Sequence, residues 1–187
     1  VYSEGFSPRP RVAFGLALPT GHASDGEYVD IRLDHEPTEA LSILCARLTE
    51  VLPDGITVPV AEVIPQGTPS LQEAVVACTW TADLGGPNLD QVEAAIVATL
   101  AADELPIERE RKGKAQVVDL RPAINELSVE EDPADRAVVL TAVLATRPPT
   151  FRPAERVEVL DPSWRALRAG TKSTRVTHED TRRENAQ

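Results

Sequence analysis

The chain has 187 residues, enough for one domain or for two small halves that share a core. It carries 30 acidic and 19 basic residues, and its net charge of −11 opposes nonspecific binding to nucleic acid. Any contact with RNA must therefore come from a local basic patch, and we expect no DNA partner.

Two cysteines, Cys45 and Cys78, occur singly inside apolar stretches. They form no ligand set for an iron–sulfur cluster, so the chain cannot itself be a cluster-bearing enzyme. No apolar run approaches the roughly 20 residues that a membrane span needs, and no signal peptide is visible. These features predict a cytoplasmic protein that does not enter a membrane.

The first part of the chain predicts two strands, a helix and a third strand. Residues 11–19 and 27–33 alternate apolar and polar side chains, and the turn residues between them predict an antiparallel hairpin. In residues 37–52 apolar positions recur every three or four residues, which indicates a helix. Residues 56–64 predict another strand, placed at a sheet edge because Pro59 cannot donate a hydrogen bond.

The middle of the chain predicts a short helix, a strand and a longer helix. Ser70 and Glu73 have the spacing of a capping box, which is a likelier role for Ser70 than that of a nucleophile. Residues 74–84 then predict a strand, and residues 89–102 predict a helix with Asn88 as its N-cap.

The last part begins with a predicted hairpin around Lys112 and Gly113 and ends in a polar extension. We expect 170–187 to be a mobile tail because its apolar content is low. The remaining predictions are strands at 107–111 and 114–120, a helical turn at 122–128, an acidic loop at 130–135, a strand at 136–146 and a short helix at 153–160.

This order of elements predicts an α+β fold built from two ferredoxin-like halves, with an antiparallel sheet and helices on one face. The first half spans 1–65 and is incomplete at its N-terminus, the second spans 66–160, and 161–187 is a C-terminal extension.

A stiff loop opens the chain, because Pro8 and Pro10 fix the backbone beside cationic and aromatic residues. Such a loop can grip a phosphate or a base, or it can simply pack against the core. Together with the turn of the first hairpin it makes a candidate polar pocket. The pocket residues are Glu4, Phe6, Arg9, Arg11, Ser24 and Glu27.

Positive charge is concentrated at the hairpin around Lys112, where it can reach the phosphates of RNA. A merely solvated hairpin is the alternative, since Glu108 and Glu110 dilute the charge. The candidate RNA-binding residues are Arg9, Arg11, Arg109, Arg111, Lys112, Lys114 and Arg121.

The sequence predicts no metal site. His22 lies near Glu27 and Asp30, but these two carboxylates fall on opposite faces of one strand and do not converge. No P-loop, dinucleotide fingerprint or Ser–His–Asp set occurs, so we expect no cofactor.

Two blocks near the N-terminus resemble DUF2344, also called the radical SAM-associated domain. They are Tyr-Ser-Glu-Gly-Phe-Ser-Pro-Arg-Pro at residues 2–10 and Gly-His-Ala-Ser-Asp-Gly-Glu-Tyr at residues 21–28. Gly67-Thr-Pro-Ser-Leu71 and Arg111-Lys-Gly-Lys114 support the resemblance, which spans residues 1–160. Ser7 and Arg9 stand where the family usually has Asn and His, so no role that needs a ring nitrogen at position 9 carries over.

The resemblance implies a bacterial accessory or binding module that works with a radical SAM enzyme and assists recognition or modification of tRNA or rRNA. Two alternatives stay open: an enzyme that uses the polar pocket, and a protein-interaction domain that docks a radical SAM partner. The family also has a strand and a basic helix before residue 2. We therefore expect that an N-terminal segment is missing here, which agrees with the absence of Met.

Overall fold

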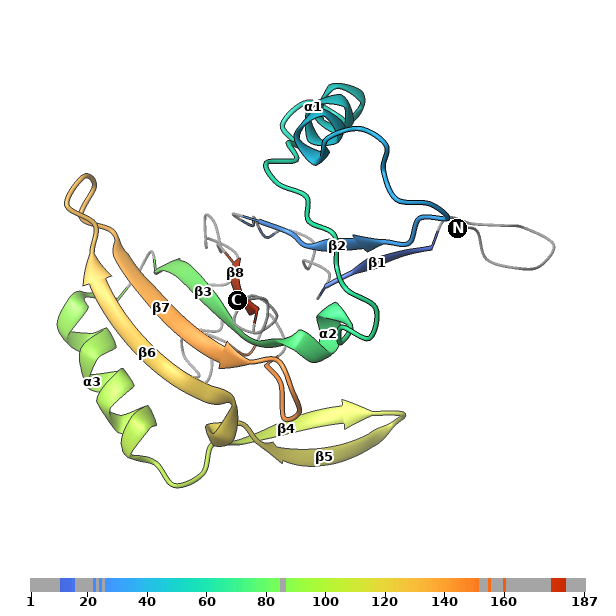
Figure 1. The fold of residues 1–187 in the computed structure, drawn as a ribbon. Helices are drawn as coiled ribbons and strands as arrows, with labels where there is room; N and C mark the ends of the chain where they lie inside the picture. The colour runs from blue at the N-terminus through green and yellow to red at the C-terminus, as the bar shows by residue number, and fades with distance from the viewer. Residues whose placement is uncertain are drawn as a thin grey trace.

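A computed structural model describes residues 11–15, 22, 24, 26–84, 87–151, 155, 160 and 176–180, the last range as backbone only. The fold is α+β, as predicted, and its largest sheet has four antiparallel strands (Figure 1). Across the sheet the strands are β6 (Ile124–Glu131), β7 (Val138–Ala145), β3 (Val75–Leu84) and β8 (Val176–Asp180).

The main core lies between this sheet and helix α3 (Leu89–Ala101), which covers one face of the sheet (Figure 1). Every second residue of β7 is buried, and Leu140 is only 2% exposed. Val92 and Ile96 of α3 pack against this apolar face. Alternate side chains of β7 therefore point into the core, as expected for a strand with one buried face.

The four-stranded sheet has the ferredoxin-like order. β7 lies between β3 and β6 and is antiparallel to both, and β3 also pairs with β8. Strand β8 lies in the extension that was expected to be mobile. This strand was not predicted, because Val176–Asp180 contains only one apolar residue.

Two of the predicted helix starts, those at Ser70 and Asn88, are confirmed. The Asn88 side chain accepts a hydrogen bond from Gln91 N at 2.9 Å at the start of α3. Ser70 and Glu73 form the capping box of α2 (Leu71–Ala74), in which Ser70 N donates to Glu73 Oε2 at 3.0 Å. These contacts satisfy backbone N–H groups that have no partner inside the helix.

The first hairpin is also confirmed. β1 (Val12–Phe14) and β2 (Val29–Ile31) form a separate two-stranded antiparallel sheet. Gly15 then lies against α2, where a Cβ atom would come within 3.0 Å of Leu71 Cβ. Glycine therefore lets the first hairpin approach the second half closely. Helix α1 (Leu41–Val51) begins four residues later than the predicted start at residue 37.

Two predictions were wrong. Residues 56–64 form no strand: Val58 N donates to the Thr49 side chain, and Pro59 has no N–H to pair. The helical turn at 122–128 is also wrong, because only η1 (Arg121–Ala123) is helical and β6 follows it. Ile124, Leu127 and Val129 face the core from β6, with a bulge after Ile124 that hid the alternation.

The acidic loop consequently begins at residue 132 and not at 130, and the strand predicted at 136–146 is β7. Most of the short helix predicted at 153–160 lies outside the described residues. Among the helices that the structure describes, none is long and apolar enough to cross a membrane.

Candidate functional site

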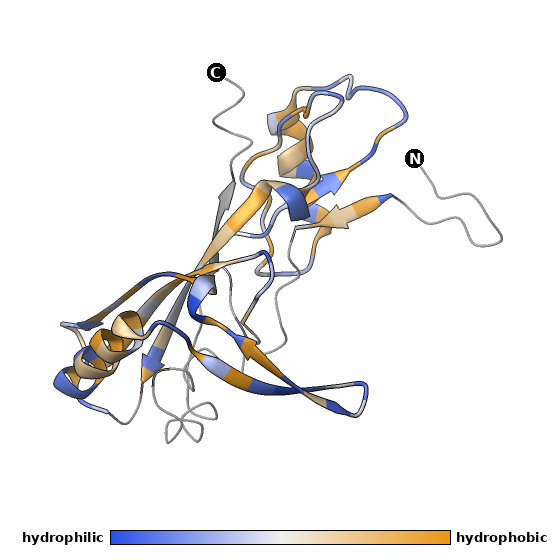
Figure 2. Cartoon of the chain, turned by 90° about the horizontal axis from the view of Figure 1, so that it is seen from below, coloured by the Kyte–Doolittle hydropathy of each residue, from blue (hydrophilic) through white to orange (hydrophobic). Residues whose placement is uncertain are grey.

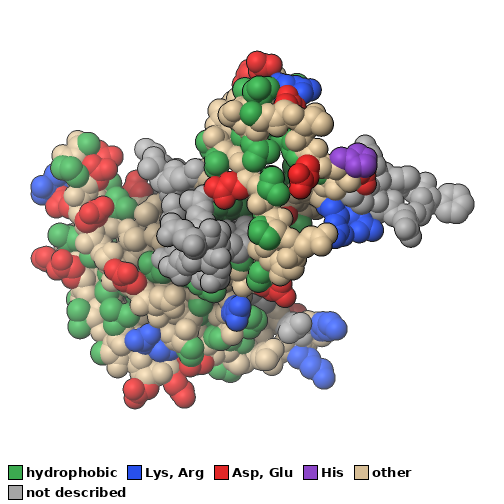
Figure 3. Space-filling model, in the orientation of Figure 1, with side chains coloured by type: hydrophobic (Ala, Val, Ile, Leu, Met, Phe, Trp, Pro, Cys, Tyr) green, Lys and Arg blue, Asp and Glu red, His purple; other side chains and the backbone are tan. Residues whose placement is uncertain are grey.

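The basic hairpin projects from the body of the molecule as β4 (Pro106–Arg111) and β5 (Lys114–Asp119) (Figure 1). Lys112 and Gly113 connect the strands and have positive φ angles of 53° and 73°. A two-residue turn needs positive φ at both positions so that its twist matches that of the strands. Lys112 and Lys114 are exposed at this tip, where Figure 3 shows Lys and Arg side chains. The turn therefore holds two cationic residues away from the core.

The strand register separates the charges of the hairpin. Glu108 pairs with Val117 and Glu110 pairs with Ala115, whereas Arg109 pairs with Gln116. Because successive side chains of a strand point to opposite faces, the two glutamates lie on one face and Arg109 lies on the other. The acidic residues therefore dilute the positive charge less than the sequence suggested.

Arg109 is committed to a contact inside the protein. Its Nε and Nη2 atoms donate to the two carboxylate oxygens of Glu155 at 2.9 and 2.5 Å, and Nη2 also donates to Thr150 O at 2.6 Å. The side chains of Arg109 and Glu155 are only 13% and 8% exposed. These bonds tie the hairpin to Thr150 and Glu155 and leave Arg109 little surface for RNA.

Arg121 is likewise engaged. Its guanidinium donates to Leu100 O at 3.0 Å and to Ala102 O at 3.2 Å. These carbonyls lie at the C-terminal end of α3, where the helix leaves acceptors unpaired and where a positive charge is favourable. Arg121 therefore stabilises the end of α3 from a distant point in the sequence.

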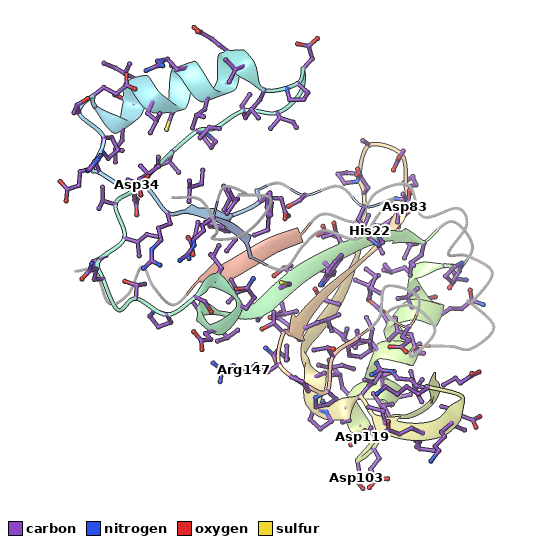
Figure 4. The ribbon with its side chains drawn as sticks, turned by 90° about the vertical axis from the view of Figure 1, so that its right-hand side faces the viewer. His22, Asp34, Asp83, Asp103, Asp119 and Arg147 are labelled. Atoms are coloured by element: carbon purple, nitrogen blue, oxygen red, sulfur yellow. The ribbon has the colours of Figure 1, made fainter. Side chains whose placement is uncertain are left out.

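Asp119 holds the base of the hairpin (Figure 4). Its Oδ1 accepts hydrogen bonds from Leu105 N at 2.7 Å and from Arg121 N at 3.0 Å. Both bonds favour the ionised carboxylate, so they lower the pKa of Asp119 below its ordinary value, the bond from Leu105 contributing most.

Asp119 should make stability depend on pH in the acid range. The pKa of Asp119 is lower in the folded protein than in the unfolded chain, where it is about 4. The ionised carboxylate therefore stabilises the fold above about pH 4, and this stabilisation is lost as the pH falls through the pKa of the folded state. We expect Asp119→Asn to flatten the fall in the free energy of unfolding below about pH 4, measured by urea denaturation. If the free energy of unfolding falls as steeply below about pH 4 in the variant as in the wild type, these hydrogen bonds do not stabilise the charged form.

A second cationic site lies on the β1–β2 sheet. The register places Arg11 opposite Arg32, and Arg32 N donates to Arg11 O at 3.1 Å. Both side chains are exposed. Arg32 was not among the predicted site residues, although an antiparallel pairing of residues 11–19 with 27–33 can place it opposite Arg11.

The polar pocket stays a prediction, since Glu4, Phe6 and Arg9 lie outside the described residues. Arg11 lies at one end of the β1–β2 sheet, beyond the pair Val12 and Ile31. Ser24 and Glu27 precede β2 at the other end. The Ser24 side chain forms hydrogen bonds with the backbone of Gly26, the N–H of which donates to Ser24 Oγ at 3.3 Å. The described members of this set therefore do not converge.

His22 packs edge-on against Trp80 of β3, with ring centroids 5.7 Å apart, and Figure 4 shows it beside that strand. This contact joins the first hairpin to the main sheet. Within the described ranges, no group of three or more His, Cys, Asp or Glu side chains is placed to hold a metal ion.

Residues 1–153 match the model of a protein family described as "Uncharacterized protein conserved in bacteria (DUF2344)". No curated protein and no solved structure matches the chain.

Proposed function

Because the chain belongs to the DUF2344 family of uncharacterised bacterial proteins, we propose that it is an accessory module that contacts structured RNA, either tRNA or rRNA. One observation carries the proposal: Lys112 and Lys114 are exposed at the tight turn that ends the β4–β5 hairpin. Exposed lysines can neutralise phosphates, and contacts to phosphates supply much of the affinity of proteins for nucleic acids.

The paired arginines add to this surface. The Arg11–Arg32 end of the first hairpin and the tip of the β4–β5 hairpin lie on the same side of the molecule, the right-hand side in Figures 1 and 3. A folded RNA is large enough to reach two such sites at once, and its shape and phosphates are what proteins recognise in double-stranded regions. The link to a radical SAM enzyme is supported by the family resemblance alone.

The proposal predicts that Lys112→Glu with Lys114→Glu weakens binding of total tRNA or rRNA by the full-length protein at least about tenfold at low salt. Loss of two phosphate contacts should also reduce the slope of log K against log salt by about 1.5. Filter binding at several salt concentrations measures both effects.

Arg47→Glu is the control matched in charge to the single hairpin variant Lys112→Glu, because each reverses one positive charge; Arg47 is exposed on α1 and pairs with Glu39. It should leave RNA binding within about twofold of the wild type. If the control and the hairpin variant weaken binding equally, only net charge matters and the hairpin is not a binding site. An absence of binding by the wild type at low salt would reject the function itself.

Docking of a radical SAM partner is a second candidate function. The observation that favours it is the apolar face of the β1–β2 sheet, where the side chains of Val12, Phe14, Val29 and Ile31 lie together and are 41–59% exposed. Patches of this kind mark sites of association with other proteins.

A further inference from the structure

The β4–β5 hairpin extends away from the main sheet and has a hydrophilic tip (Figure 2). Its two strands pair with each other and with no other strand that the structure describes. A two-stranded sheet is only marginally stable alone. The direction in which the hairpin points therefore depends on its contacts with the rest of the protein.

The first contacts lie at the base of the hairpin. Leu120 N donates to Leu105 O at 2.9 Å, and Asp119 Oδ1 accepts hydrogen bonds from Leu105 N and Arg121 N. Leu120 is buried, which anchors the end of β5 in the core. The turn at Lys112 is at the other end of the strands, roughly 20 Å away at about 3.3 Å per residue, so the base alone does not fix its place.

The second contacts lie about halfway along β4. Arg109 binds both carboxylate oxygens of Glu155 and the carbonyl of Thr150. Among the hairpin side chains that the structure describes, Arg109 is the one beyond the base that forms hydrogen bonds with the rest of the protein. It is three residues from Lys112, so these bonds act close to the tip.

The contact with Glu155 sets the direction of the hairpin as well as its place. Two parallel hydrogen bonds between one guanidinium and one carboxylate fix the relative orientation of the two groups. Lys114 pairs with Arg111, which is two residues from Arg109, so Lys114 projects from the same face as Arg109. Turning the hairpin about its long axis would therefore break the contact with Glu155 and move the charge of Lys114.

Burial makes this ion pair suitable for holding the hairpin. The side chains of Arg109 and Glu155 are almost enclosed by the protein, so water competes little for their hydrogen bonds. The exposed pair of Arg47 and Glu39 differs, because water and salt screen pairs of that kind and they contribute little.

We propose that Arg109 and Glu155 are positioning residues, which hold the hairpin in the direction in which Lys112 and Lys114 reach the same RNA as the arginines of the first hairpin. This inference rests on the proposed function. Neither member of the pair touches the RNA. Without their contact the RNA must order the hairpin when it binds, and the conformational entropy that this costs lowers the affinity.

Glu155→Gln tests the proposal, because charge and positioning predict opposite results. The substitution removes a negative charge and releases the Arg109 guanidinium, so electrostatic attraction alone would strengthen RNA binding. The loss of positioning should instead weaken the binding of total tRNA or rRNA by the full-length protein about fivefold in filter binding.

A second background separates positioning from a general loss of stability. The variant Lys112→Glu, Lys114→Glu already lacks the contacts that the pair positions, so adding Glu155→Gln to it should change binding less than about twofold. Glu131→Gln is the matched control. It also removes one negative charge that pairs with an arginine, Arg136, but at the turn between β6 and β7, far from the β4–β5 hairpin (Figure 1). It should leave binding within about twofold of the wild type.

Nuclear magnetic resonance measures the orientation of the hairpin without RNA. In Glu155→Gln the backbone order parameter of Gly113 should fall from about 0.85 towards 0.6, whereas the order parameters of α3 should stay unchanged. Circular dichroism checks that the variant folds.

RNA binding by Glu155→Gln that equals or exceeds that of the wild type would overturn the inference and leave the proposed function standing. An equal loss in both backgrounds would also overturn it, because the pair would then support the whole fold and not the placement of the lysines. So would an unchanged order parameter at Gly113. An absence of RNA binding by the wild type would reject the proposed function and this inference together.

Discussion

Arg109→Ala is expected to lower the free energy of unfolding by about 3 kcal/mol. The substitution removes the guanidinium that binds both carboxylate oxygens of Glu155, a side chain that is only 8% exposed, so a buried carboxylate loses two charge-assisted hydrogen bonds. It also removes the donor to Thr150 O. Urea denaturation followed by circular dichroism measures the loss.

Replacing both Arg109 and Glu155 with apolar residues shows why the single variant loses stability. The loss can come from burying the Glu155 carboxylate without Arg109, or from losing a net attraction between the two side chains. Arg109→Leu with Glu155→Leu removes both charges, so it should recover most of the stability that Arg109→Ala loses. If Arg109→Ala costs less than about 1 kcal/mol, water reaches the Glu155 carboxylate and the pair does not hold the hairpin.

Leu140→Ala is expected to cost about 3 kcal/mol, as large-to-small substitutions in well-packed cores do. Leu140 is 2% exposed on β7, between Ala82 of β3 and Val129 of β6, in the cluster that α3 covers. A cavity at this point cannot be filled by movement of a loop, because regular strands flank it on both sides.

Val97→Ala is the matched control for the core substitution. Val97 lies on α3 but is 68% exposed, so its truncation should change stability by less than about 0.5 kcal/mol. Equal losses for the two variants in urea denaturation would mean that α3 does not pack on the sheet in the way described.

Local chemistry explains which elements were predictable. Asn88 with Gln91 marks the start of α3, and Lys112 with Gly113 marks the tight turn between β4 and β5. In each case residues within three or four positions supply the signal, because they satisfy backbone groups or permit positive φ. The hairpin of β1 and β2 was predictable from the alternation of apolar and polar residues in each strand and from the turn residues between them.

Other elements depend on distant partners and were missed. β8 exists through its pairing with β3, about 100 residues away in the sequence, and its own residues carry no strong strand pattern. Residues 56–64 show the reverse case: the alternation of a strand is present, but no described strand pairs with it. An apolar pattern gives a segment the capacity to pair, and tertiary contacts decide whether it does.

The candidate site shows the same limit. Arg109 and Arg121 looked like Lys112 and Lys114 in the sequence, but the structure commits the first two to Glu155 and to the end of α3. Glu155 is 46 residues from Arg109, so no local pattern distinguishes the structural cations from the exposed ones. The opposing pair Arg11 and Arg32 needed the hairpin register to become visible.

Ultraviolet crosslinking of the full-length protein to the RNA that it binds, followed by mass spectrometry of the crosslinked peptides, tests the central claim most directly. The account predicts crosslinks at Lys112–Lys114 and around Arg11 and Arg32, the cationic sites on one side of the molecule. Crosslinks confined to other surfaces, or none above the level of the Lys112→Glu, Lys114→Glu variant, would contradict it.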